Sequence, residues 1–176
     1  MNKFQKEVKR RHNEDMIYLS GYNQGKEDEK KKTRGYCGIG IENSKFEINL
    51  GTLWRSAYCF GADFIFTIGR RYTPQASDTT KAHRHIPYYH YDTIDDFIGH
   101  LPYDCKLIGI ENPDDAQYLK TFQHPERAIY LLGAEDVGLS EEIMKLCARI
   151  VKIDSRICLN VATTGSIVLY DRMAKM

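Results

Sequence analysis

The sequence lacks the features that mark membrane, secreted disulfide-rich and zinc-ribbon proteins. It contains no run of 18 apolar residues, which is about the length needed to span a bilayer. The N-terminal stretch MNKFQKEVKRRHNEDM is charged from its start and has no apolar core of a secretory signal. Its five cysteines are an odd number without a C-x-x-C pair, which favours reduced thiols. We therefore expect a cytoplasmic protein that does not bind membranes.

Two nucleotide-binding fingerprints and a large net charge are missing as well. No G-x-G-x-x-G follows the first apolar run and no P-loop occurs, which argues against a nicotinamide enzyme and against ATP hydrolysis. The net charge is only +1, but residues 1–34 hold ten Lys and Arg against six acidic residues. Such a basic arm suits contact with phosphates, and a solvated tail is the alternative.

The order of apolar runs predicts one domain after the arm. The stretch 23–32 is charged and has no apolar residue, so we expect an arm and linker over 1–34 and a domain over 35–176. Helical patterns alternate with short apolar runs, which predicts an α/β domain with a mainly parallel sheet and helices on both faces. The expected strands are 36–41, 63–68, 105–110, 129–132 and 150–153. Expected helices include 49–60 with Asn49 as its cap, one starting near 112–115, and one from Leu159 onward.

Two polar loops follow neighbouring expected strands. Gly133 and Gly138 bracket a tight loop after residues 129–132, and Ser140 is a good cap for the helix that follows. A second loop, 154–158, follows the strand expected at 150–153. Both loops should lie at the carboxyl edge of a parallel sheet, where open α/β sheets bind ligands. Ordinary turns between strand and helix are the alternative.

The segment 69–91 combines basic and aromatic residues. It contains four cations and a single acid, interleaved with tyrosines and histidines. The cations are Arg70, Arg71, Lys81 and Arg84. This mixture fits single-stranded RNA, because cations meet phosphates and rings stack on bases. Two histidines two residues apart, at 83 and 85, are the pair closest to a metal-binding pattern, but no further ligand has suitable spacing, so we expect no metal site.

Three motifs in order resemble those of the SpoU-like (TrmH-type) RNA ribose 2'-O-methyltransferases of the SPOUT class. The first, N-x-G-x-x-x-R-[ST]-A, begins at Asn49 and contains Arg55. The second, G-x-E-x-x-G-L-S, spans 133–140, and the third, L-N-V, spans 159–161. The resemblance covers about residues 36–173, and this chain has Cys158 where the family has a small polar residue.

The resemblance implies an activity, a cofactor and a site. The methyl donor would be S-adenosyl-L-methionine, and the acceptor the ribose 2'-hydroxyl of tRNA or rRNA. The implied catalytic residues are Arg55, Asn49, Glu135 and Asn160. The implied cofactor site is lined by Ile110, Leu132, Gly133, Gly138, Ile153, Cys158 and Leu159. A deep trefoil knot formed by the C-terminal segment is also implied, although general folding rules argue against knots.

A homodimer is a further expectation. The last helix has the small residues Ala162, Gly165 and Ser166 followed by Leu169 at helical spacing, a row that lets another helix approach closely. The same row can also pack within one chain. Two other functions remain open at this point: an RNA-binding protein of the same fold without transfer activity, and a regulatory domain whose glycine loops hold a small effector.

Overall fold

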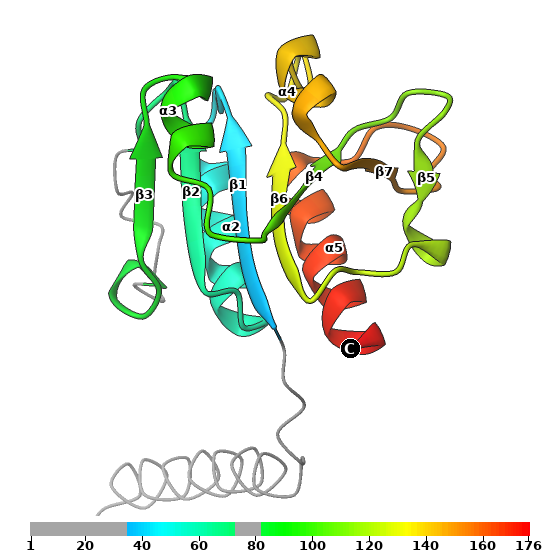
Figure 1. The fold of residues 1–176 in the computed structure, drawn as a ribbon, viewed down its shortest axis with the longest axis horizontal. Helices are drawn as coiled ribbons and strands as arrows, with labels where there is room; N and C mark the ends of the chain where they lie inside the picture. The colour runs from blue at the N-terminus through cyan, green and yellow to red at the C-terminus, as the bar shows by residue number, and fades with distance from the viewer. Residues whose placement is uncertain (1–34, 73–81) are drawn as a thin grey trace, which may run out of the picture. The chain divides into compact units, whose positions relative to one another are not determined.

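The computed structural model describes residues 35–72 and 82–176, which form a seven-stranded sheet in the order β3-β2-β1-β6-β4-β7-β5 (Figure 1). All six strand pairs are parallel, which confirms the expected α/β sheet. The strands are β1 Tyr36–Glu42, β2 Phe64–Ile68, β3 Tyr88–Tyr91, β4 Lys106–Ile110, β5 Gln117–Tyr118, β6 Arg127–Leu132 and β7 Arg149–Lys152. The arm expected over 1–34 lies outside the described residues.

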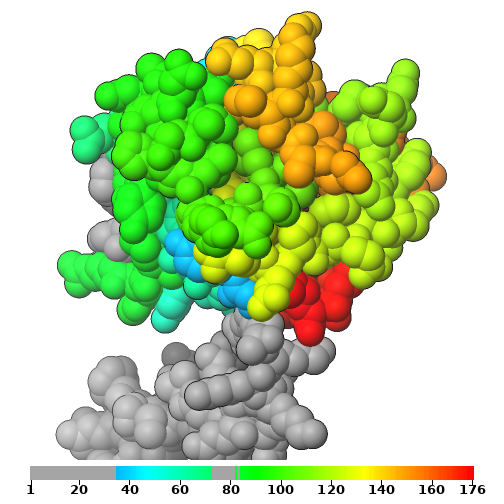
Figure 2. Space-filling model, in the orientation of Figure 1, coloured from blue at the N-terminus to red at the C-terminus, as the bar shows by residue number. Residues whose placement is uncertain are grey.

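Helices cover both faces of the sheet, as expected. Helices α2 (Glu47–Cys59) and α5 (Val161–Lys175) pack on one face, and α3 (Ile94–Gly99) and α4 (Glu141–Leu146) lie on the other (Figure 1). Figure 2 shows the side chains of α3 and α4 gathered over that second face. Strand β6 is buried on both sides, because Tyr130 joins the core under α2 and α5 while Ile129 joins the core under α3 and α4. Burial on both faces explains why the central strands read as continuous apolar runs.

Two short 3₁₀ helices complete the described elements, η1 (Ala82–Arg84) and η2 (Leu119–Thr121). Within residues 35–72 and 82–176, no helix is long and apolar enough to cross a membrane. In the same residues, no group of three or more His, Cys, Asp and Glu side chains is placed to hold a metal ion.

The row of small residues on α5 packs inside the chain. A Cβ added to Gly165 would lie 2.4 Å from Cδ1 of Leu53 on α2 and 3.3 Å from Cδ1 of Ile39 on β1. Ala162 and Leu169 are buried in the same core. The row therefore brings α5 close to α2 and the sheet, which is the second of the two expected uses of the row, and the homodimer stays a prediction.

The C-terminal end of α5 is anchored by buried polar contacts. The guanidinium of Arg172 donates to the carbonyl oxygen of Glu126 at 2.7 Å. The ring of His124 bridges Asp171 on α5, at 2.9 Å, and the hydroxyl of Tyr130 on β6, at 2.5 Å. Burial lowers the pKa of His124, although Asp171 opposes the shift. These contacts hold α5 against β6, so its opposite end stays fixed at the carboxyl edge of the sheet.

Three of the expected helices differ from those in the structure. Helix α2 begins at Glu47 with Phe46 in the cap position, so the predicted cap role of Asn49 is wrong. The helix expected near 112–115 is not formed: Lys152 instead donates to the carbonyl oxygen of Asp114, and the chain leads into β5. The last helix starts at Val161, two residues late, because Asn160 caps it. The trefoil knot stays a prediction from the family resemblance.

Candidate cofactor cavity and polar wall

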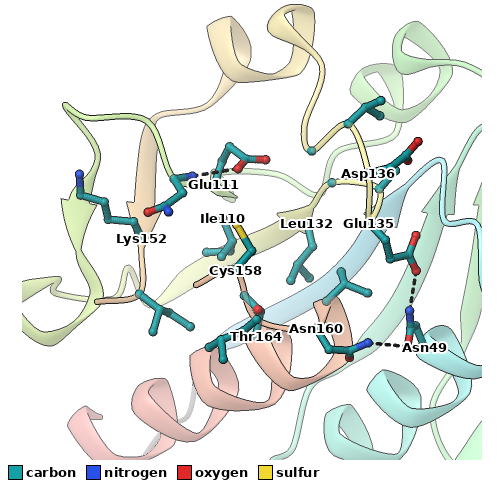
Figure 3. A pocket seen from close by; sticks show the side chains of 18 of the residues that line it. Asn49, Ile110, Glu111, Leu132, Glu135, Asp136, Lys152, Cys158, Asn160 and Thr164 are labelled. Carbon is teal, nitrogen blue, oxygen red and sulfur yellow. Dashed lines mark hydrogen bonds between the residues drawn. The ribbon is translucent and has the colours of Figure 1, made fainter. Parts of the chain in front are cut away.

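A cavity of about 620 Å³ opens where the loops after β4, β6 and β7 meet (Figure 3). Its size falls within the range of about 300–1,000 Å³ typical of small-molecule sites. Ile110 and Leu132 are paired neighbours at the carboxyl ends of β4 and β6, so both reach this edge together. The cavity lining includes all seven residues expected to bind the cofactor: Ile110, Leu132, Gly133, Gly138, Ile153, Cys158 and Leu159.

Three of the four expected catalytic residues form one hydrogen-bonded chain in the cavity wall (Figure 3). The amide nitrogen of Asn160 donates to Oδ1 of Asn49 at 2.9 Å. The amide nitrogen of Asn49 in turn donates to Oε1 of Glu135 at 2.6 Å. The chain links α2, the loop after β6 and the start of α5, so each of the three sequence motifs contributes one member.

Asn160 is oriented by its role as the cap of α5. Its side-chain oxygen accepts the backbone N–H groups of Ala162, at 2.9 Å, and Thr163, at 3.3 Å. Because the oxygen faces the helix, the amide nitrogen points toward Asn49. The capped end of α5 also presents the positive end of the helix dipole at the cavity wall.

Glu135 is held as a carboxylate. Burial by itself raises the pKa of its carboxyl, but hydrogen bonds from Asn49 and from backbone N–H groups outweigh burial and hold the pKa below its usual range. One of these donors is the N–H of Lys45, 3.0 Å from Oε2. A carboxylate with a lowered pKa is a poor proton acceptor, so this geometry suits positioning of Asn49.

The glycine loop of residues 133–138 is closed by its own backbone. Ala134 and Gly138 exchange two backbone hydrogen bonds, of 3.2 and 2.9 Å. Gly138 has a φ of 68°, the left-handed region that favours glycine. A Cβ at Gly133 would lie 2.0 Å from the carbonyl carbon of Gly138. Valine at 133 would therefore collide with the loop itself before it reached the cavity.

Two acidic residues that the sequence analysis missed fix the end of this loop. Oε2 of Glu111 accepts the N–H of Leu139 at 2.8 Å, and Oε2 of Glu42 accepts the N–H of Ser140 at 2.9 Å. Glu42 ends β1 and Glu111 directly follows β4. An acid at the carboxyl end of an apolar strand was the available signal. Glu111 lines the cavity, and so do further residues that were not predicted as site residues, among them Phe46, Asn112, Val137, Lys152 and Thr164.

Arg55, the fourth expected catalytic residue, does not line the cavity. It is exposed on α2, whereas its neighbours Leu53 and Trp54 are buried. Its guanidinium has no hydrogen bond or ion pair with any residue in the described part of the chain. We call the hydrogen-bonded chain of Asn160, Asn49 and Glu135 the polar wall. Arg55 is not part of the polar wall within its own chain.

The residues expected to bind RNA are divided between the two edges of the sheet. Arg70 follows β2 at the carboxyl edge and donates to the carbonyl oxygen of Lys45 at 2.8 Å. Arg71 is exposed beside it. Arg84 is exposed in η1, which precedes β3 at the amino edge. Lys81 lies outside the described residues.

Several solved structures are similar in fold to this chain. The SpoU methyltransferase AviRb from Streptomyces viridochromogenes has a TM-score of 0.72 and 22% identity, over 79% of this chain and 59% of its own. The A. aeolicus TrmH/SpoU tRNA modifying enzyme has a TM-score of 0.72 and 16% identity, over 82% and 81%. A structure concerned with 2-OH methylation of C/U34 on tRNA has a TM-score of 0.68 and 20% identity, over 81% and 97%.

Sequence comparison identifies the family directly. No curated protein matches this chain. The model of the SpoU rRNA Methylase family matches residues 38–170. That range contains all three motifs and the whole polar wall, and it is well over half of the 176 residues. The chain therefore belongs to the SpoU rRNA Methylase family.

Proposed function

We propose that this protein transfers a methyl group from S-adenosylmethionine to the ribose 2'-hydroxyl of an RNA, either tRNA or rRNA. The observation that carries the proposal is the hydrogen-bonded chain from Asn160 through Asn49 to Glu135 in the cavity wall. Family membership supports a methyltransferase. Among the similar structures, AviRb has been solved in complex with AdoMet, and another concerns 2-OH methylation on tRNA.

The cavity fits the proposed cofactor by its size and by its walls. Ile110, Leu132 and Ile153 come from the ends of three strands and give apolar surfaces for a purine ring. Asn112 and Lys152 add polar groups for the amino-acid part of the molecule. S-adenosylmethionine supplies a methyl group that its positively charged sulfur has already activated.

Transfer then depends on alignment. The 2'-oxygen forms a bond to the methyl carbon as the carbon–sulfur bond breaks, and the hydroxyl proton leaves to solvent. Holding the two reactants in line contributes roughly 7–11 kcal/mol to such reactions. Asn49 and Asn160 are locked in place by their mutual hydrogen bond, so they offer fixed polar atoms to the ribose.

Arg55 is the proposed cation of the site. A guanidinium with a pKa above about 12 is a poor base, so its role is to grip the phosphate of the reacting nucleotide and stabilise the developing oxyanion. Because Arg55 lies away from the cavity of its own chain, we place it in the site of a second copy.

A homodimer through the outer surface of α2 and α5 would achieve this. Ile48 on α2 and Ile167 and Tyr170 on α5 are exposed apolar side chains on these two helices. Arg55 is exposed on α2 as well. Burial of these apolar side chains would stabilise a contact between two copies there. The same contact would bring Arg55 of one copy toward the cavity of the other.

Two linked measurements test the function. Calorimetry measures whether the protein binds S-adenosylmethionine, and labelled cofactor then reports methyl transfer to RNA from a strain that lacks the gene. We expect both binding and transfer. Cofactor binding without transfer to any RNA would reject the enzymatic proposal, and RNA binding without cofactor binding would favour a non-catalytic RNA-binding protein.

A further inference from the structure

An exposed aromatic ring stands at the mouth of the cavity. Phe46 is 57% exposed and is the sole aromatic side chain among the described residues that line the cavity. It occupies the cap position of α2 but forms no side-chain hydrogen bond there, so helix capping does not explain the choice of phenylalanine. A large apolar ring that is exposed to solvent beside a ligand cavity is therefore available to contact a ligand.

A second apolar side chain lies on the same rim. Val137, in the loop after β6, is 75% exposed and also lines the cavity. The two loops are tied together by the residues that precede these side chains: Lys45 forms an ion pair with Asp136, and the N–H of Lys45 donates to Glu135. Phe46 and Val137 each follow a residue of that ion pair in the chain, so the tie holds both on one rim.

Positive charge accompanies the apolar pair. The Arg70 guanidinium donates to the carbonyl oxygen of Lys45, the residue just before Phe46, at 2.8 Å, and Arg71, which follows Arg70, is exposed. An aromatic ring with adjacent cations is the pattern by which proteins bind unpaired nucleotides: the ring stacks on the base and the cations meet the phosphates.

We propose that Phe46 and Val137 grip the nucleobase of the nucleotide that is methylated, with Phe46 stacked on its face. The inference rests on the proposed function, because it places the ribose at the polar wall. The backbone N–H of Asn49 donates to the carbonyl oxygen of Phe46 at 3.0 Å, so the two residues lie in the first turn of α2. A base against Phe46 therefore sets its own ribose near Asn49 and Glu135.

The grip has a consequence for specificity. Every base has a π-face, so stacking on Phe46 accepts all four bases. The contact therefore positions the target nucleotide without reading its identity. Discrimination between RNA sites must come from contacts to the flanking nucleotides.

A tryptophan at position 46 gives a direct readout of stacking. Trp54 is the single tryptophan of the chain and is only 3% exposed, so it contributes a constant background. In the Phe46→Trp variant, a stacked base should quench the new, exposed fluorophore. Tyr103→Trp is the matched control, because Tyr103 is 91% exposed and does not line the cavity. Titrants are S-adenosylmethionine alone and RNA from a strain that lacks the gene.

Quenching of Phe46→Trp by RNA but not by the cofactor alone, with no response of Tyr103→Trp, is the expected result. Quenching by the cofactor alone would overturn the proposal, since the ring would then contact the adenosyl group. A change of the emission with protein concentration and no ligand would also overturn it, because a second copy would then cover the ring. If anisotropy shows that RNA is bound but the emission of Phe46→Trp does not change, the proposal is also overturned.

Affinity measurements separate this inference from the proposed function. Phe46→Ala should weaken RNA binding about ten-fold and also slow single-turnover transfer at saturating RNA, because the ring positions the ribose, and it should change cofactor affinity far less than RNA affinity. Unchanged RNA affinity in a folded variant would overturn the inference while methyl transfer by the wild type stands. If Phe46→Trp is quenched but the wild type transfers no methyl group, the base site stands and the proposed function fails.

Discussion

Asn49 on α2 donates a 2.6 Å hydrogen bond to the carboxylate of Glu135, which lies 86 residues further along the chain. The oxygen of the same Asn49 amide accepts from Asn160 at 2.9 Å. Asn49 is therefore the middle member of the polar wall, and it is buried. Substitution of Asn49 should therefore disturb residues of all three motifs, because Glu135 and Asn160 lose their hydrogen-bond partner.

Replacing Asn49 should damage both the fold and the site. Asn49→Ala removes both hydrogen bonds and should lower the free energy of unfolding by about 1–3 kcal/mol. Asn49→Asp should be worse at neutral pH, because it sets a second carboxylate against Glu135. Urea unfolding measures both effects, with Thr52→Ala on the exposed side of the same helix as the control. Equal free energies of unfolding for the Asn49→Ala variant and the wild type would show that the two hydrogen bonds of Asn49 do not stabilise the fold.

The stability that Glu135 contributes should depend on pH. Its pKa is lowered in the folded protein, so its contribution is full above the ordinary value of about 4.3 and is lost as the pH falls through the lower folded value. Glu135→Gln should therefore cost about 1–2 kcal/mol at pH 7 and progressively less below about pH 4. The exposed Glu141→Gln serves as the control. A cost that does not change with pH would contradict the assigned hydrogen bonds.

Cys158 offers a chemical probe of the cofactor cavity. It is exposed and lines the cavity, whereas Cys59 is exposed on α2 outside it. A bound cofactor should slow alkylation of Cys158 and leave the rate at Cys59 unchanged. Peptide mass spectrometry reads both thiols from one sample, so Cys59 is an internal control. Equal alkylation of Cys158 with and without saturating S-adenosylmethionine would place the cofactor elsewhere.

Arg55→Ala should slow methyl transfer by about a hundred-fold, or roughly 3 kcal/mol, without loss of thermal stability, because Arg55 is exposed. Arg55→Lys should rescue little, because an ammonium lacks the planar two-pronged grip. The exposed Lys145→Ala on α4 is the control. Near-normal single-turnover rates for Arg55→Ala would remove this residue from the chemistry.

Mixing two inactive variants tests whether Arg55 acts across a dimer. Arg55→Ala and Asn160→Ala chains, each impaired alone, should together regain roughly a quarter of wild-type activity, since half of the randomly paired dimers carry one intact site. Light scattering should give about twice the chain mass of 20.4 kDa. Ile167→Glu should reduce that mass to a single chain. No recovery on mixing would place Arg55 in the site of its own chain.

The local parts of the fold were predictable from the sequence. Strands β1, β4 and β6 are buried on both faces, so they appear as unbroken apolar runs bounded by polar loops. Gly138 has the positive φ expected of a loop glycine. Gly133, Gly138 and Leu159 were predictable because they belong to the family motifs that follow β6 and β7.

Long-range contacts were not predictable in this way. Asn49 looked like a helix cap because nothing local shows that its partners are Glu135 and Asn160. Gly165 looked like a contact for another chain because nothing local shows that Leu53 fills the space beside it. The order of the strands decides both contacts, and a local pattern does not encode that order.

The most direct test of the central claim is methyl transfer mapped on the RNA. Purified protein, labelled S-adenosylmethionine and RNA from a strain that lacks the gene are combined, and the RNA is cleaved with alkali. A 2'-O-methyl group protects the adjacent phosphodiester bond, so we expect label in an alkali-resistant dinucleotide at a defined position, and much less label with Asn160→Ala. Label on a base, or no label in RNA despite cofactor binding, would contradict it.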